Sequence, residues 1–225
     1  MNRLTDWIAN LGARHYITAV LLAAALGIAA ALMLSNGGKV EAKECPVNEA
    51  AHDALNGVAQ GQLAALQATG AGRGYNDLAF IDDTGRPLTI ADFAGKVLLV
   101  NFWATWCAPC RAEMPALNNV AAEYNSDDFA IVTINLDLGD EGVQKAQTFL
   151  DEEGLGNLPL YADPSFAAFD LLKKEGVSLG LPTTLLIDDK GCELAVLQGP
   201  AEWDTDDGRQ VVETLIGLKE SEAGA

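Results

Sequence analysis

The chain has 225 residues, of which 49% are hydrophobic, so global disorder is excluded and one good-sized domain with an additional segment is expected. Its 14 Lys and Arg residues are outnumbered by 32 Asp and Glu residues, and the formal net charge is −18 at pH 7. A surface this acidic repels phosphate backbones and anionic headgroups, which argues against nucleic-acid binding and against electrostatic docking on lipids.

The first feature along the chain is an apolar stretch without charged residues at positions 16–34. At about 1.5 Å per residue it reaches about 28 Å, close to the roughly 30 Å hydrocarbon core of a bilayer. We expect a single transmembrane anchor, with residues 1–15 on the cytoplasmic side. A cleaved signal peptide ending near residues 29–31 is the alternative interpretation. The Lys and Arg residues on the two sides give only a weak bias in orientation.

The segment after the anchor, residues 35–74, is expected to be a linker that includes one helix. Apolar spacing over residues 48–69 predicts a helix that packs on the main domain, although Gly57 and Gly61 weaken the pattern. A glycine-rich break follows at 71–74. We therefore expect the main domain to cover residues 75–225.

Strands and helices alternate in the main domain. Apolar runs bounded by turn residues predict strands at 78–81, 87–89, 97–103, 130–137, 158–162, 183–188 and 193–198. Amphipathic spacing predicts helices at 109–124, 141–153, 165–175 and 208–219. The continuous apolar run at 97–103 is typical of a buried strand in a parallel sheet. This order predicts an α/β sheet covered by helices on both faces.

Two of the four cysteines, Cys107 and Cys110, lie where the strand at 97–103 gives way to a helix. The N-terminus of a helix carries partial positive charge and free N–H groups, which stabilise a thiolate. We expect Cys107, at the outer end, to attack a substrate disulfide. Cys110, one turn further in, would then resolve the mixed disulfide.

Other interpretations of this cysteine pair lack supporting residues. A zinc site needs a second pair of cysteines or histidines, and the chain offers only His15 and His52. A copper site lacks the histidine that usually accompanies thiolates, and two structural thiols would be poorly placed in an exposed turn. We therefore expect no metal and no cofactor.

Residues 95–117 read GKVLLVNFWATWCAPCRAEMPAL and resemble the active-site segment of the thioredoxin superfamily. They resemble in particular its TlpA branch, which comprises membrane-anchored thiol–disulfide oxidoreductases of the bacterial periplasm. The resemblance runs from Tyr75 to the C-terminus and includes Pro115 and the tripeptide 181–183, which matches the family's cis-proline loop. It implies a thioredoxin fold with the TlpA-type central insertion, at about 138–165. The acidic face of this insertion is most simply solvated, and a role in partner selection is the alternative.

The resemblance also implies roles for residues around the cysteines. Pro182, if cis, would expose a backbone edge on which a substrate segment could pair. Trp106 would shield the sulfur atoms and touch substrate, and a place in the core is the equally open alternative. Asn101 occupies the position at which thioredoxins proper carry a buried Asp, and its amide cannot exchange a proton. Glu113 is then the candidate for deprotonating Cys110, whereas a solvated glutamate on the helix face is the alternative.

The other two cysteines, Cys45 and Cys192, are left over, and the even count suggests that they pair. Two free thiols are the alternative. A structural disulfide requires an oxidising compartment, so this pairing would place the domain outside the cytoplasm. We therefore expect a single-pass protein of the bacterial inner membrane with its C-terminal domain in the periplasm.

The resemblance implies a reductase that a membrane electron donor keeps reduced. Its expected substrates are cysteine pairs of periplasmic proteins, namely a Sco-like copper chaperone, the copper subunit of cytochrome oxidase, or apocytochrome c. A copper chaperone or non-catalytic thiol-binding module of oxidase assembly is the alternative, although Sco-type proteins have a longer cysteine spacing and a distant histidine. A peroxidase of the peroxiredoxin type would need Thr or Ser in place of Ala104.

Overall fold

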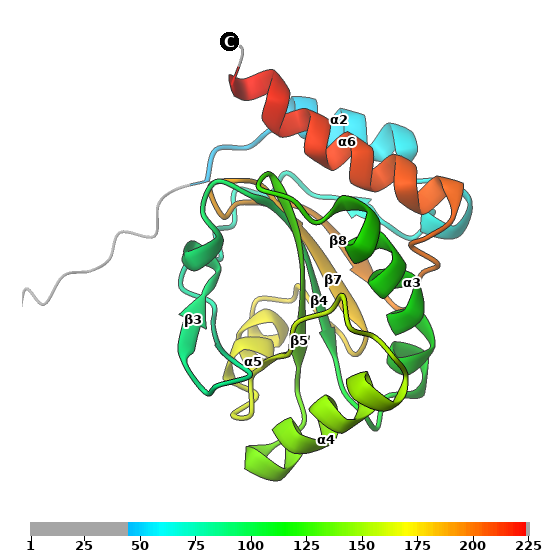
Figure 1. The fold of residues 1–225 in the computed structure, drawn as a ribbon. Coiled ribbons are helices and arrows are strands. Elements are labelled where there is room, and N and C mark those ends of the chain that lie inside the picture. Colours follow the sequence, from blue (N-terminus) through cyan, green and yellow to red (C-terminus); the bar gives the residue numbers. More distant parts are fainter. Residues whose placement is uncertain (1–44, 224–225) are drawn as a thin grey trace, which may run out of the picture. The chain divides into compact units, whose positions relative to one another are not determined.

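The computed structural model describes residues 45–223 (Figure 1), so the predicted anchor at 16–34 and the expected cytoplasmic residues 1–15 lie outside the described part. Within the described part, none of the helices combines the length and the apolar character needed to cross a bilayer. The compact unit extends over Glu44–Ala225. The segment that precedes Tyr75 therefore belongs to the same unit as the predicted main domain.

The described residues form one sheet of eight strands in the order β1-β8-β7-β4-β5-β6-β2-β3. The strands are β1 (Gln67–Ala68), β2 (Ala79–Asp82), β3 (Pro87–Thr89), β4 (Val97–Trp103), β5 (Phe129–Asn135), β6 (Tyr161–Ala162), β7 (Thr183–Ile187) and β8 (Glu193–Gln198). The central strand β4 runs parallel to β5 and antiparallel to β7. The strands predicted at 87–89, 97–103 and 193–198 are confirmed with the same bounds.

Helices cover both faces of this sheet, as the alternating pattern predicted (Figure 1). They are α2 (Glu49–Val58), α3 (Ala108–Tyr124), α4 (Gly139–Glu152), α5 (Ala167–Lys174) and α6 (Asp206–Ala223), with short 3-10 turns η1 (Gly61–Leu63) and η2 (Ile90–Phe93). Buried residues of α2, α3, α4 and α6 share one apolar core. Buried residues of α5 belong to a second core on the opposite face.

Strand β4 supplies both cores because successive side chains of a strand point to opposite faces. All seven of its residues are buried. Leu99 and Trp103 pack in the core beneath α3, whereas Val100 and Phe102 pack in the core beneath α5. The position between Leu99 and Trp103 on the α3 face is occupied by the polar residue Asn101. The predicted buried strand is confirmed. Its one polar side chain, the amide of Asn101, lies in the apolar core beneath α3.

The helix predicted over residues 48–69 is much shorter in the structure. Asn48 caps α2 by accepting a hydrogen bond from the Ala51 N–H at 2.9 Å, but the helix ends at Val58. Gly61 has φ +51°, and a Cβ atom there would lie 2.0 Å from a carboxylate oxygen of Asp207. The chain then forms η1 and enters β1, which pairs with β8. The Gln62 N–H donates to the Asp207 carboxylate of α6 at 3.1 Å, so a side chain at position 61 would collide with the residue that holds this turn.

A covalent and a polar link attach the segment before Tyr75 to strand β8. The structure joins Cys45 to Cys192 through a disulfide across 147 residues, with the two Cα atoms 5.5 Å apart. The next residue, Glu193, is buried and accepts hydrogen bonds from the side chains of Thr69, Arg73 and Tyr75. These links make residues 45–75 an integral edge of the sheet.

Removing the long-range disulfide should destabilise the domain. In the C45S/C192S double variant we expect the free energy of unfolding to fall by about 2–5 kcal/mol, because the unfolded chain regains the entropy of a long open loop. Urea unfolding followed by tryptophan fluorescence measures this change. The matched control is C107S/C110S, whose bridge spans a separation of three residues. Equal losses in the two double variants would contradict this assignment.

Candidate active site

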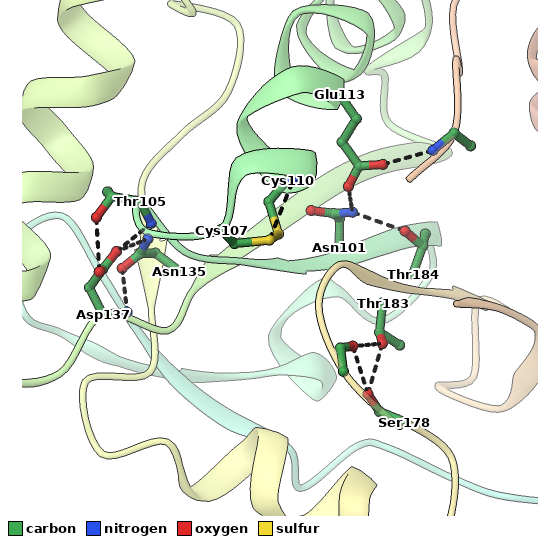
Figure 2. Close-up of a disulfide and its surroundings, with 12 residues drawn as sticks. Asn101, Thr105, Cys107, Cys110, Glu113, Asn135, Asp137, Ser178, Thr183 and Thr184 are labelled. Carbon is green, nitrogen blue, oxygen red and sulfur yellow. Dashed lines mark hydrogen bonds between the residues drawn. A yellow bond between two sulfur atoms is a disulfide. The ribbon is translucent and has the colours of Figure 1, made fainter. Parts of the chain in front are cut away.

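Cys107 and Cys110 lie at the junction between strand β4 and helix α3 (Figure 2). Cys107 is the N-cap residue of α3, and its Sγ accepts a hydrogen bond from the Cys110 N–H at 3.3 Å. The two cysteines form a disulfide with their Cα atoms 5.3 Å apart, so the structure has the oxidised form of the pair. In the reduced form, the same N–H and the helix N-terminus would stabilise a thiolate on Cys107.

The two cysteines differ in their access to solvent, although by less than the sequence suggested. Cys107 is 6% exposed and Cys110 is fully buried. The sequence predicted an accessible outer end for Cys107, but Cys107 is largely buried and shares its groove with Gly180 and Leu181 of the loop before β7. Only Cys107 lines the adjoining surface groove. A substrate disulfide can therefore reach Cys107 first, whereas Cys110 is accessible only from the Cys107 side.

Glu113 lies one helical turn after Cys110, and residues three apart share a helix face. It is 3% exposed, so the alternative of a solvated glutamate on the helix surface is wrong. Its Oε1 accepts a hydrogen bond from Asn101 Nδ2 at 2.8 Å, and its Oε2 accepts one from the Ala201 N–H at 3.1 Å. A carboxyl group is therefore held on the buried side of the cysteine pair (Figure 2).

Burial raises the pKa of Glu113 to about 7, because desolvation disfavours the charged carboxylate. The hydrogen bonds from Asn101 and Ala201 act in the opposite direction and limit the rise. A group that titrates near neutral pH can both accept and release a proton under ordinary conditions. The geometry therefore equips Glu113 for exchanging a proton within the buried part of the site.

Asn101 connects this carboxyl group to the neighbouring strand. Its Nδ2 donates to Glu113 and also to Thr184 Oγ1, at 2.9 Å, in β7. Its Oδ1 is buried and lacks a hydrogen-bond partner among residues 45–223. The amide at this position therefore orients the carboxyl group of Glu113 instead of exchanging protons itself.

The loop before β7 approaches the cysteines from the other side of the sheet edge. The peptide bond between Leu181 and Pro182 is cis. Thr183 Oγ1 donates to the Gly180 carbonyl at 2.7 Å and lies 2.7 Å from Ser178 Oγ. These bonds fix the loop beside the cysteine pair, where the sequence resemblance expected a cis-proline.

A groove of about 460 Å³ adjoins Cys107. It is lined by Trp106, Cys107, Ala108, Pro109, Phe166, Phe169, Lys173, Leu179, Gly180 and Leu181. Trp106 is 65% exposed, so the alternative that it is a core aromatic residue is wrong. Its indole instead forms part of the groove wall directly next to the reactive sulfur.

One polar cluster near the cysteines was missed by the sequence analysis. The carboxylate of Asp137 accepts hydrogen bonds from the N–H and the hydroxyl of Thr105, at 2.8 and 2.9 Å, and from Asn135 Nδ2 at 2.8 Å. Asp137 therefore holds the loop that leads into Cys107, on the side opposite Glu113 (Figure 2). The available signal was the position of the two polar residues at the end of a strand parallel to β4, because Asn135 is the last residue of β5 and Asp137 lies two residues further on.

Comparisons with known proteins agree with this geometry. Residues 67–215 match the Redoxin family. The chain is 34% identical over 113 residues to the thioredoxin-like protein YneN of Bacillus subtilis and 38% identical over 120 residues to the thiol-disulfide oxidoreductase ResA of Oceanobacillus iheyensis. These matches cover 48% and 53% of the chain, and the chain spans only 59% and 58% of those relatives.

A solved structure shows the same likeness. A Chlorobium tepidum protein assigned as a thiol:disulfide interchange protein DsbE superposes with a TM-score of 0.51 at 30% sequence identity. The match covers 62% of this chain and 92% of that protein. The α/β sheet described above is thus a thioredoxin-like fold.

The raised pKa of Glu113 makes a prediction about stability. Between pH 4.5 and 7 the folded state retains a proton that the unfolded state loses, so the stability of the wild type falls as the pH rises. The side chain of E113Q does not titrate. We therefore expect the free energy of unfolding of E113Q, relative to that of the wild type, to rise by up to about 3 kcal/mol from pH 4 to pH 8. Urea unfolding at several pH values measures this difference. A pH-independent difference would show that Glu113 is ionised with an ordinary pKa.

Proposed function

The chain belongs to the Redoxin family, and from this premise we propose that it is a thiol–disulfide oxidoreductase that reduces disulfides in other proteins. The observation that carries the proposal is the arrangement of Cys107, Cys110 and Glu113 at the start of α3. One sulfur is accessible, one is buried behind it, and a carboxyl group that titrates near neutral pH lies on the buried side. This order matches the two steps of disulfide exchange.

In the first step, the Cys107 thiolate attacks one sulfur of a substrate disulfide. A new S–S bond forms between Cys107 and that sulfur, the substrate S–S bond breaks, and the other substrate sulfur leaves as a thiolate. The Cys110 N–H, 3.3 Å from Cys107 Sγ in the oxidised form, stabilises the attacking thiolate. The cis-proline loop at Pro182 offers a backbone edge on which the substrate segment lies.

In the second step, the Glu113 carboxylate accepts the proton of the Cys110 thiol. The Cys110 thiolate attacks Cys107 Sγ, the mixed disulfide breaks, and the second substrate sulfur leaves as a thiolate. Two electrons have then passed from the cysteine pair to the substrate. The protein is left with the Cys107–Cys110 disulfide that the structure contains.

We also propose the TlpA-like setting that the sequence indicates. Residues 16–34 would anchor the protein in the bacterial inner membrane, the domain would lie in the periplasm, and a dithiol electron donor in the membrane would reduce the cysteine pair again. The Cys45–Cys192 disulfide supports this setting, because such bonds persist in oxidising compartments. Candidate substrates are a Sco-like copper chaperone, the copper subunit of cytochrome oxidase and apocytochrome c.

Substituting the buried cysteine should capture the substrate. In C110S, attack by Cys107 still occurs but resolution is blocked, so we expect a stable mixed disulfide with the partner protein. Non-reducing electrophoresis followed by mass spectrometry of the captured species measures this. The control is C107S, which should capture nothing. Equal capture by both variants, or by neither, would contradict the assigned order of attack.

The role of Glu113 can be tested by its effect on resolution. In the wild type, the release of the second product thiol after rapid mixing should become faster as the pH rises through about 7, because the carboxylate then accepts the proton. We expect the release to be about 100-fold slower in E113Q, and we expect its rate no longer to rise as the pH passes through about 7. The control is E123Q, an exposed glutamate on the same helix. An unchanged profile in E113Q would exclude the role.

A further inference from the structure

The groove beside Cys107 contains a single charged side chain, Lys173, among its lining residues. Residues 41–225 include 31 acidic and only 11 basic residues. In the described part of the chain Arg73, Arg86, Arg209 and Lys219 are each paired with a carboxylate. Lys173 has no carboxylate within 4.0 Å among residues 45–223. An acidic domain therefore keeps a cation without a paired carboxylate in the groove that adjoins its reactive sulfur.

The walls of the groove expose large apolar side chains. Leu179 is 84% exposed and Trp106 is 65% exposed, and the two come from separate loops that both line the groove. Exposed apolar side chains that line one groove are typical of a binding site, whereas single exposed apolar residues are common on any surface.

A strained residue completes the groove. Phe166 has φ 64° and ψ 7°, a left-handed conformation that is rare for a bulky side chain. It is held by the buried Asp163, whose carboxylate accepts hydrogen bonds from Ser165 and from the Ala168 N–H, and by packing of its ring on Phe169 at 5.3 Å. Strain of this kind persists where the surroundings enforce it and is concentrated at ligand sites.

We propose that this groove selects substrate segments that carry a large apolar side chain and a carboxylate beside the reactive disulfide. The apolar side chain covers Trp106, Leu179 and Phe166, and the carboxylate pairs with Lys173. The acidic surface of the rest of the domain repels a substrate carboxylate. The carboxylate is therefore favourable only at the position beside Lys173, and this fixes the orientation of the bound segment. The inference rests on the proposed function and adds a substrate class to it.

The helix itself supplies a matched control for the charge. Lys173 and Lys174 both lie in the last turn of α5, where either would stabilise the helix dipole, but only Lys173 lines the groove. K173Q and K174Q therefore make the same change in net charge and in helix capping. Only K173Q removes the cation from the groove.

The test uses the reduced full chain and synthetic peptides with one intramolecular disulfide, scanned with Glu, Gln or Lys on either side of the cysteines. At one position we expect the Glu peptide to be reduced about 2- to 5-fold faster than the Lys peptide, the range for one exposed ion pair. The preference should fade at 1 M salt, where the Debye length is about 3 Å. K173Q should lose it and K174Q should retain it.

The apolar part is tested with peptides that place Leu or Ser beside the disulfide. The wild type should prefer Leu by about 5-fold, as expected for partial burial of one aliphatic side chain. L179S should lose the preference. L171S is the control, because Leu171 is an exposed leucine of α5 that does not line the groove.

A small disulfide such as hydroxyethyl disulfide, which carries neither a carboxylate nor a large apolar side chain, separates this inference from the proposed function. Failure of the wild type to reduce it would overturn the proposed function. Reduction of this probe at a normal rate, together with equal rates for all peptides, would overturn the inference alone. A loss of preference that is the same in K173Q and K174Q would also overturn it.

Discussion

The burial of one carboxyl group, that of Glu113, is the constraint on which the site depends. Three separate parts of the chain enclose it, namely helix α3, the amide of Asn101 in β4 and the N–H of Ala201 after β8. The apolar core beneath α3 makes the charged form unfavourable, and the two donors keep that penalty moderate. Without the donors the carboxyl group would stay protonated at neutral pH, and in open solvent it would be a far weaker base.

The identity of residue 101 follows from the same constraint. Two carboxyl groups at this distance would titrate as a coupled pair, and one of them would resist ionisation. An amide at position 101 avoids that coupling and still donates a hydrogen bond to Glu113 and to Thr184. The site therefore contains one proton acceptor with a defined orientation, held by a residue that cannot compete for the proton.

Sequence reasoning was sufficient where local patterns determine the structure and insufficient where distant contacts do. The apolar run of β4 and the cysteine pair at the start of α3 were predicted because each carries its signal within a few residues. The carboxyl group of Glu113 is bonded to Ala201, 88 residues away. The turn after α2 is bonded to α6 through the Gln62 N–H and the Asp207 carboxylate, across 145 residues. The left-handed conformation of Phe166 is imposed by its surroundings and has no signature in the residue itself.

The two-residue strand β6 has a consequence for how the chain can vary. In the described residues β6 pairs in parallel with β5 and antiparallel with β2, and β2 carries β3 at the edge of the sheet. The insertion that contains β6 is therefore the bridge by which the β2–β3 hairpin joins the sheet. It cannot be shortened to the minimal fold by simple deletion, since the hairpin would lose its partner strand. Lengthening or loss of α4 is tolerable only while β6 keeps its register.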